Sequence, residues 1–251
     1  HSMALLALTV EVEKGSVKIP QFQRDFVWSK QKSADLLDSI LKGYPIGTFI
    51  FWKTKEELRT IRNIGGLDIP KTPKGDYIHY VLDGQQRMTS LFAAVKGLTV
   101  EREDGEEEDF STFYVDLEAP TDEPVVFTEV EDDGDSHRWI TLKDLLYGKI
   151  KLISKYPEKA QEAIQWYKDR LNSYQFPVVT MKEAPIEVAT EVFTRLNVSG
   201  KALSMFEIMV AKTFDADKEF DLGEKYDELI EKLDDAQYGT LPDATVLQTV
   251  A

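Results

Sequence analysis

The stretch YVLDGQQRMTS, residues 80–90, joins a strand pattern to a helix pattern through one glycine. It completes the run YIHYVLD (77–83), whose apolar and aromatic residues are typical of a buried strand. Beyond Gly84 the residues favour a helix over about 85–96, with apolar side chains at helical spacing at Met88, Leu91, Phe92 and Val95. The stretch therefore predicts a strand, a tight turn and a helix in direct succession.

Such a turn is a good binding site for an anion. The first N–H groups of a helix have no partners within the helix, and its dipole places partial positive charge there. Gly84 would let the backbone approach a ligand closely, and Arg87 can grip phosphate oxygens with two N–H groups. Gln85 and Gln86 can donate to a phosphate or position a water molecule. Asp83 would repel a bare phosphate, so we expect it to hold Mg²⁺, activate water, or bind a hydroxyl or base edge.

The same residues also permit a purely structural interpretation. Asp83 can be an N-cap, Gly84 a turn residue and Arg87 a surface charge. Spacing alone leaves both interpretations open. No Walker loop, H-E-x-x-H zinc motif or G-x-S-x-G elbow occurs in the chain.

Two further clusters combine polar residues with a setting that suits binding. In IPQFQRDFVWS (19–29), Gln23 and Arg24 stand among aromatic residues, which suits contact with a base or phosphate. The alternative is an edge strand whose aromatic residues lie in the core. In VFTRLNVSGKALS (192–204), Asn197 and Lys201 lie in a glycine-containing loop between predicted helices, where either a functional role or helix capping is expected.

The net charge of −15 is unevenly distributed along the chain. Residues 101–109, 116–135 and 215–235 hold 26 of the 45 acidic residues and 4 of the 30 basic ones, which leaves the remainder at about +7. A polyanionic partner at a local site is therefore not excluded. No apolar run approaches the roughly 20 residues of a membrane span, and we expect no membrane partner. The absence of cysteine excludes disulfides and thiolate metal sites and fits a cytoplasmic protein.

The remaining patterns predict an α+β fold that becomes more helical after about residue 139. Residues 59–76 read as a loop and 101–110 as an acidic hairpin tip or loop. Further strands are predicted at 47–52, 113–117, 124–130 and 175–181. Helices are predicted after a cap at Ser29 or Ser33, and at 156–172, 186–196, 204–214 and 222–234.

Four stretches together resemble the N-terminal domain of the GmrSD-type restriction endonuclease family, over about residues 9–214. They are IPQFQRDFVW, LLDSILKGYPIGTFIFW, YVLDGQQRMTSL and VFTRLNVSGKALSMFEI. The family is known for its D-G-Q-Q-R motif and is related to ParB and sulfiredoxin domains. The resemblance implies a ParB/sulfiredoxin-like nucleotide-binding core at 9–138 and a mainly helical portion at 139–251, after a tag remnant and N-terminal segment at 1–8.

The resemblance also implies a function and its residues. In the family the D-G-Q-Q-R turn binds a nucleotide phosphate and supports NTP hydrolysis or DNA-directed nuclease action. Carried across, Asp83, Gln86 and Arg87 are the expected catalytic residues, and Asp83 is the expected ligand of Mg²⁺ or another divalent cation. The expected nucleotide-binding residues are Gln23, Arg24, Gly84, Gln85, Arg87, Asn197 and Lys201; Asn197 and Gly200 match the N-x-x-G loop of the family.

The resemblance places the chain in a prokaryotic defence nuclease that restricts foreign or modified DNA, with an NTP as substrate or effector. Many relatives add a C-terminal H-N-H nuclease domain. No segment of this sequence resembles one, so we expect cleavage to need a C-terminal or separate nuclease domain, and a continuation past Ala251 is left open. The alternatives are a nucleotide-gated DNA-binding regulator of ParB-like type that does not hydrolyse NTP, and an interaction domain whose acidic segments mimic DNA.

Overall fold

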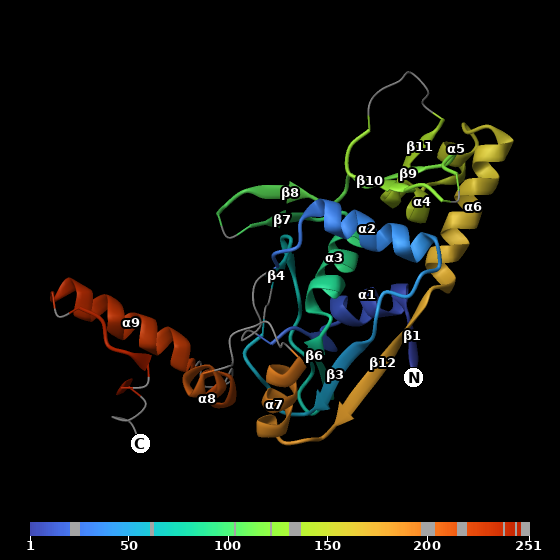
Figure 1. Ribbon diagram of the computed structural model, residues 1–251. Helices are drawn as coiled ribbons and strands as arrows, with labels where there is room; N and C mark the ends of the chain where they lie inside the picture. Colours follow the sequence, from blue (N-terminus) through green and yellow to red (C-terminus); the bar gives the residue numbers. More distant parts are fainter. Residues whose placement is uncertain are drawn as a thin grey trace.

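The structure is a computed structural model that describes most of the chain, namely residues 1–20, 26–60, 63–102, 104–120, 122–130, 137–196, 204–214, 220–237, 239–243 and 245–246. These residues form a mixed α+β fold around one curled, five-stranded sheet, which confirms the predicted class (Figure 1). The strands of this sheet lie in the order β1 (Ser2–Ala4), β12 (Gln175–Lys182), β3 (Phe49–Thr54), β6 (Ile78–Asp83) and β2 (Val17–Lys18).

The sheet is mixed in direction. β12 runs parallel to β3, and β2 runs parallel to β6, whereas β3 pairs antiparallel with β6 and β1 antiparallel with β12. Because β12 comes late in the chain, the sheet takes strands from both of the portions predicted from the sequence. The central pair, β3 and β6, carries the strand that leads into the D-G-Q-Q-R turn.

Helices cover both faces of the central strands. In chain order the described helices are α1 (Leu5–Glu13), α2 (Lys30–Leu41), α3 (Gln85–Lys96), α4 (Leu142–Tyr147), α5 (Ile150–Ile153), α6 (Glu158–Ser173), α7 (Ile186–Leu196), α8 (Met205–Thr213) and α9 (Leu222–Asp235). Phe49, Phe51 and Val81 point into the main core beneath α1, α2 and α3. Alternate strand residues such as Trp52 and Tyr80 point to the other face, where α7 packs (Figure 1).

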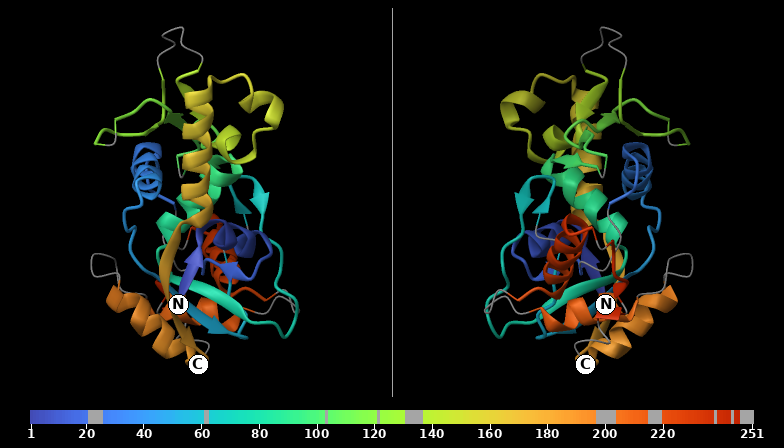
Figure 2. Two further views of the ribbon diagram at one scale, coloured as in Figure 1. Left: turned by 90° about the vertical axis from the view of Figure 1, so that its right-hand side faces the viewer. Right: turned by 90° about the vertical axis from the view of Figure 1, so that its left-hand side faces the viewer.

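Smaller sheets complete the fold. β10 (Val126–Phe127), β9 (Tyr114–Asp116) and β11 (Trp139–Thr141) form a three-stranded sheet next to α4. Two hairpins are formed by β4 (Asn63–Ile64) with β5 (Leu67–Asp68), and by β7 (Thr99–Glu101) with β8 (Glu107–Asp109). The small sheet and α4 to α6 lie at the end of the molecule opposite α7 and α8 (Figure 2). No helix in the described ranges is long and apolar enough to cross a bilayer.

Most predicted elements occur where the sequence patterns place them. The bounds of α3 and α7 agree with the predictions 85–96 and 186–196. Ser29 is the N-cap of α2, since its side chain accepts a hydrogen bond of 3.2 Å from the Lys32 N–H. The acidic stretch at 101–110 is a hairpin, which is one of the two predicted alternatives.

Two regions differ from the predictions. Residues 1–8 are predicted to be a tag remnant and N-terminal segment, and the structure places β1 and the start of α1 there: β1 pairs with β12, and Leu5 and Leu8 are fully buried. The apolar residues of α1 occupy most positions of the helix and give little amphipathic pattern, so the sequence does not indicate which face is buried. The predicted loop 59–76 contains the β4–β5 hairpin, which turns through Gly65 and Gly66.

Candidate functional site

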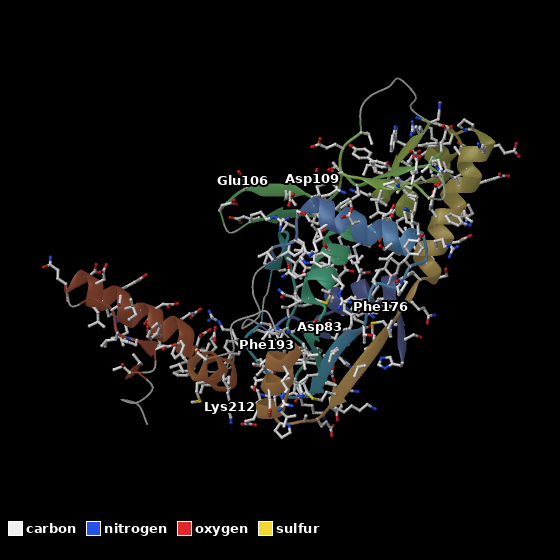
Figure 3. All side chains as sticks on the ribbon, viewed as in Figure 1. Asp83, Glu106, Asp109, Phe176, Phe193 and Lys212 are labelled. Carbon is white, nitrogen blue, oxygen red and sulfur yellow. The ribbon has the colours of Figure 1, made fainter. Side chains whose placement is uncertain are left out.

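The D-G-Q-Q-R turn follows directly from the end of β6 in the centre of the molecule. Asp83 is the last residue of β6, where the pairing with β3 is irregular, and it is labelled in Figure 3. Gly84 is the N-cap of α3, with a φ of 97° that disfavours any residue with a Cβ. A Cβ at this position would also lie 2.6 Å from Cδ1 of Phe49. The interpretation of Asp83 as the N-cap is therefore wrong, because Gly84 occupies that position and no side chain caps the helix.

The Arg87 side chain lies inside the fold rather than on the surface. Its guanidinium donates hydrogen bonds to the carbonyl oxygens of Ile46 at 2.7 Å and Thr48 at 2.9 Å, and to Oδ2 of Asp83 at 3.0 Å. It also stacks 4.7 Å from the ring centre of Phe49. Only 15% of the side chain is exposed, and burial lowers its pKa while the charge of Asp83 acts in the opposite direction. The interpretation of Arg87 as a surface charge is wrong, and its predicted phosphate contact competes with these bonds.

Gln86 holds a distant segment against α3. Its side chain is 7% exposed, and Oε1 accepts hydrogen bonds from the N–H groups of Val27 at 2.9 Å and Trp28 at 3.2 Å. These two residues follow Gln23 and Arg24 in the chain. Gln23 and Arg24 themselves lie outside the described residues.

A cavity of about 770 Å³ opens beside the first two turns of α3. Gln85 and Thr89, one helical turn apart, face this cavity, and both are buried. The hydroxyl of Thr89 is buried and has no hydrogen-bond partner in the described part of the chain. The cavity is also lined by Ile19, Phe26, Asn63, Ile64, Gly65, Gly66, Thr99, Val100, Glu101, Arg102 and Glu107.

Arg102 fixes one wall of this cavity. It donates hydrogen bonds to the carbonyl oxygens of Phe26 at 3.0 Å and Trp28 at 2.7 Å, and it pairs with Glu108. Its guanidinium also lies 4.8 Å from the ring centre of Phe26. Residues 26–28 are therefore bound from two sides, by Gln86 and by Arg102.

Sequence reasoning missed Thr89 and Arg102. Thr89 follows Gln85 by four residues on a predicted helix, a spacing that places both on one face. Arg102 is the single basic residue in the acidic stretch 101–109. This position indicates a structural ion pair, but less clearly than the spacing of Gln85 and Thr89 indicates a shared helix face. The other predicted residues, Asn197, Gly200 and Lys201, lie outside the described residues between α7 and α8.

The described carboxylates do not form a metal site by themselves. No group of three or more His, Asp or Glu side chains that could hold a metal ion occurs in the described residues. The Asp83 side chain is 40% exposed, and it accepts the hydrogen bond from Arg87 through Oδ2. Magnesium is often bound by one or two carboxylates together with phosphate oxygens. Asp83 alone therefore does not fit a resident ion held only by protein, and it is not among the described residues that line the cavity.

Comparison with known proteins identifies the family. The model of the GmrSD restriction endonuclease N-terminal domain matches residues 7–214. The chain belongs to this family. It is also similar to the uncharacterized protein MJ0686 of Methanocaldococcus jannaschii, with 26% identity over 258 residues that cover 90% of this chain and 43% of that protein. The chain thus spans less than half the length of this relative. In this GmrSD N-terminal domain, the D-G-Q-Q-R turn supplies one face of the central cavity through Gln85.

Proposed function

We propose that this chain is a nucleotide-binding domain that hydrolyses an NTP with Mg²⁺ and acts in a cytoplasmic, modification-dependent DNA restriction nuclease of prokaryotes. The observation that carries the proposal is the cavity at the start of α3, which is lined by Thr89, a residue whose buried hydroxyl has no partner among the described residues. A buried hydroxyl of this kind costs stability unless a ligand or water bonds to it. The cleavage of DNA is assigned to a C-terminal or separate nuclease domain.

The size and position of the cavity support a nucleotide ligand. Its volume of about 770 Å³ lies within the range of small-molecule sites, about 300–1,000 Å³. It adjoins the N-terminus of the twelve-residue helix α3, whose first N–H groups favour negative charge. A mixed sheet in which β6 turns through Gly84 into this helix is also consistent with a ParB/sulfiredoxin-like core.

We propose two groups of site residues. Gln85 and Thr89 face the cavity and are proposed to bind the nucleotide directly. Gln86 and Arg87 hold residues 27–28 and 46–48 in place, so we propose that they position the site. Gln23 and Arg24 are proposed to close over the nucleotide from the segment that Gln86 anchors, and Asn197 and Lys201 to contact it from the loop after α7.

Asp83 is proposed to serve the hydrolytic step. With phosphate oxygens of the substrate it would hold Mg²⁺, which neutralises negative charge on the phosphates when bound. The exposed carboxylate can also accept a proton from the attacking water. The ion pair with Arg87 orients this carboxylate at the strand end.

Calorimetry with each common NTP and assay of phosphate release with Mg²⁺ test the proposal. Asp83→Asn should retain much of the NTP affinity, because it also removes a negative charge near the phosphates, while turnover should fall about 100-fold or more. The matched control is Asp76→Asn, at an exposed loop position, which should change neither property. Absence of binding for every NTP would overturn the proposal, and equal turnover in Asp83→Asn and the parent would remove Asp83 from catalysis.

A second candidate is a nucleotide-gated DNA-binding regulator without hydrolysis. It is favoured by the observation that Gln86 and Arg87, two of the predicted catalytic residues, direct their hydrogen bonds to other parts of the protein. NTP binding without any phosphate release would select this candidate. Arg24→Ala should weaken NTP binding by about 1–3 kcal/mol under both candidates, because the variant cannot form a charge-assisted hydrogen bond.

A further inference from the structure

A basic corner lies between α4 and α5, at the end of the molecule away from α7 and α8 (Figures 1 and 2). We define the lysine corner as Tyr147, Lys149, Ile150, Lys151 and Lys155. Four of these residues, together with Asp144, Gly148 and Leu152, line an open hollow of about 420 Å³. From its charge, exposure and rigidity we infer that the lysine corner binds the phosphate backbone of double-stranded DNA.

The charge of the corner differs from that of the chain as a whole. The chain carries a net charge of −15, yet residues 145–157 contain three lysines and no acidic residue. The three lysine side chains form no ion pair in the described structure, whereas Lys42 pairs with Asp38 at 2.8 Å and Lys96 with Glu13 at 2.6 Å. The positive charges at the corner are thus available to a polyanion.

Exposed apolar side chains accompany these charges. Ile150 is 87% exposed and Tyr147 is 55% exposed. Side chains this exposed contribute little to packing within the chain. Beside phosphate-binding lysines, an aliphatic or aromatic side chain can pack against deoxyribose or a base edge, so the combination suits a nucleic acid.

The corner is held rigidly by the fold. α4 is capped by the Thr141 hydroxyl, and Leu142, Leu145 and Leu146 are buried in the main core. The turn after α4 is closed by a hydrogen bond of 2.7 Å from the Gly148 N–H to the Asp144 carbonyl. α5 has no fully buried residue, but Ile153 and Tyr156 pack against the main core. Because the chain is anchored on both sides of the corner, ligand binding requires only limited ordering of the backbone here.

The corner is separate from the nucleotide cavity. α3 begins at the cavity and is roughly 18 Å long, and its C-cap, Gly97, lies next to Lys143 of α4 at the other end of the helix. A DNA contact at the corner would therefore leave the nucleotide cavity accessible. The choice of DNA as the polyanion rests on the proposed role in restriction, but it does not depend on NTP binding or hydrolysis.

Fluorescence anisotropy with a labelled duplex of about 30 base pairs, at several salt concentrations, tests the inference. The variant is Lys149→Gln, Lys151→Gln, Lys155→Gln in one chain. At about 0.1 M salt its affinity should fall by tenfold or more, and the slope of log affinity against log salt should become shallower by about 0.9 for each phosphate that the variant no longer neutralises. A control variant with Lys225→Gln and Lys232→Gln on the acidic helix α9 should bind like the parent.

The outcomes distinguish DNA binding at the lysine corner from DNA binding elsewhere and from binding to a membrane surface. NTP affinity measured by calorimetry should be the same in the lysine variant and the parent, which separates this surface from the proposed nucleotide site. If the parent binds DNA and the lysine variant binds it equally well, the lysine corner is not the DNA contact and the inference is refuted. The inference is also refuted if the parent does not bind DNA at low salt. Binding of the parent to phosphatidylserine vesicles but not to duplex DNA would assign the corner to a membrane surface and refute the inference.

Discussion

Replacing Thr89 by valine should change stability and ligand affinity in opposite directions. Valine keeps the shape of the side chain but removes a buried hydroxyl that has no partner among the described residues. An unsatisfied buried polar group costs about 1–3 kcal/mol, and we take the lower end of this range for a single neutral hydroxyl. Thr89→Val should therefore raise the free energy of unfolding of the ligand-free protein by about 1 kcal/mol. NTP affinity should fall by about 2- to 10-fold, which corresponds to the loss of one hydrogen bond of about 0.5–1.5 kcal/mol.

Urea denaturation without ligand and calorimetry with NTP and Mg²⁺ measure the two effects. Thr190→Val on α7 is the matched control, because Thr190 is also 4% exposed but donates to the carbonyl oxygens of Ile186 and Glu187, both at 3.0 Å. The control should lose up to about 1 kcal/mol of stability and bind NTP like the parent. A Thr89→Val protein that is less stable, or that binds NTP with unchanged affinity, would refute the reasoning that Thr89 is reserved for a ligand.

The other expectations concern the turn itself and a titrating strand residue. Arg87→Ala should lower the free energy of unfolding by about 2–4 kcal/mol in urea denaturation, since two carbonyl groups lose a charged donor. Arg87→Lys should restore little of it, because a single ammonium cannot reach the same set of acceptors. Gly84→Ala should cost more than about 2 kcal/mol in the same assay, from its φ of 97° and the contact with Phe49; a smaller loss would mean that the turn can relax. Burial, and to a lesser degree Lys53, lower the pKa of His79 from 6.5, so the folded state binds the proton more weakly than the unfolded state. Stability should therefore decline as the pH falls below 6.5, and the decline should be smaller in His79→Gln.

The local part of the fold could be predicted because its signals lie close together in the sequence. The apolar run before Asp83 and the helical spacing after Gly84 specify β6 and α3 without reference to the rest of the chain. The same holds for the Ser29 cap and for α7, an amphipathic helix whose buried residues recur at helical spacing. The helix α1 was not predicted, because apolar residues occupy most of its positions and give little amphipathic pattern, although Leu5, Leu8 and Val12 pack in the main core.

The roles of the site residues depend on contacts that no local pattern encodes. Arg87 bonds to carbonyls about forty positions earlier in the chain, and Gln86 accepts from N–H groups nearly sixty positions earlier. The sequence therefore predicted the strand, the turn and the helix, but it did not separate the residues that hold other segments in place from those that face the cavity. Among the described residues the Thr89 hydroxyl has no hydrogen-bond partner, and this too follows from tertiary packing and not from a local pattern.

The central claim is that a nucleotide binds in the cavity beside the first turns of α3. Hydrogen exchange followed by mass spectrometry, with and without saturating NTP and Mg²⁺, tests this claim most directly. We predict slower exchange in peptides that cover residues 63–66, 85–89 and 99–102, which line the cavity from three separate parts of the chain. Unchanged exchange in all three segments at saturating NTP, or protection confined to other parts of the protein, would contradict the claim.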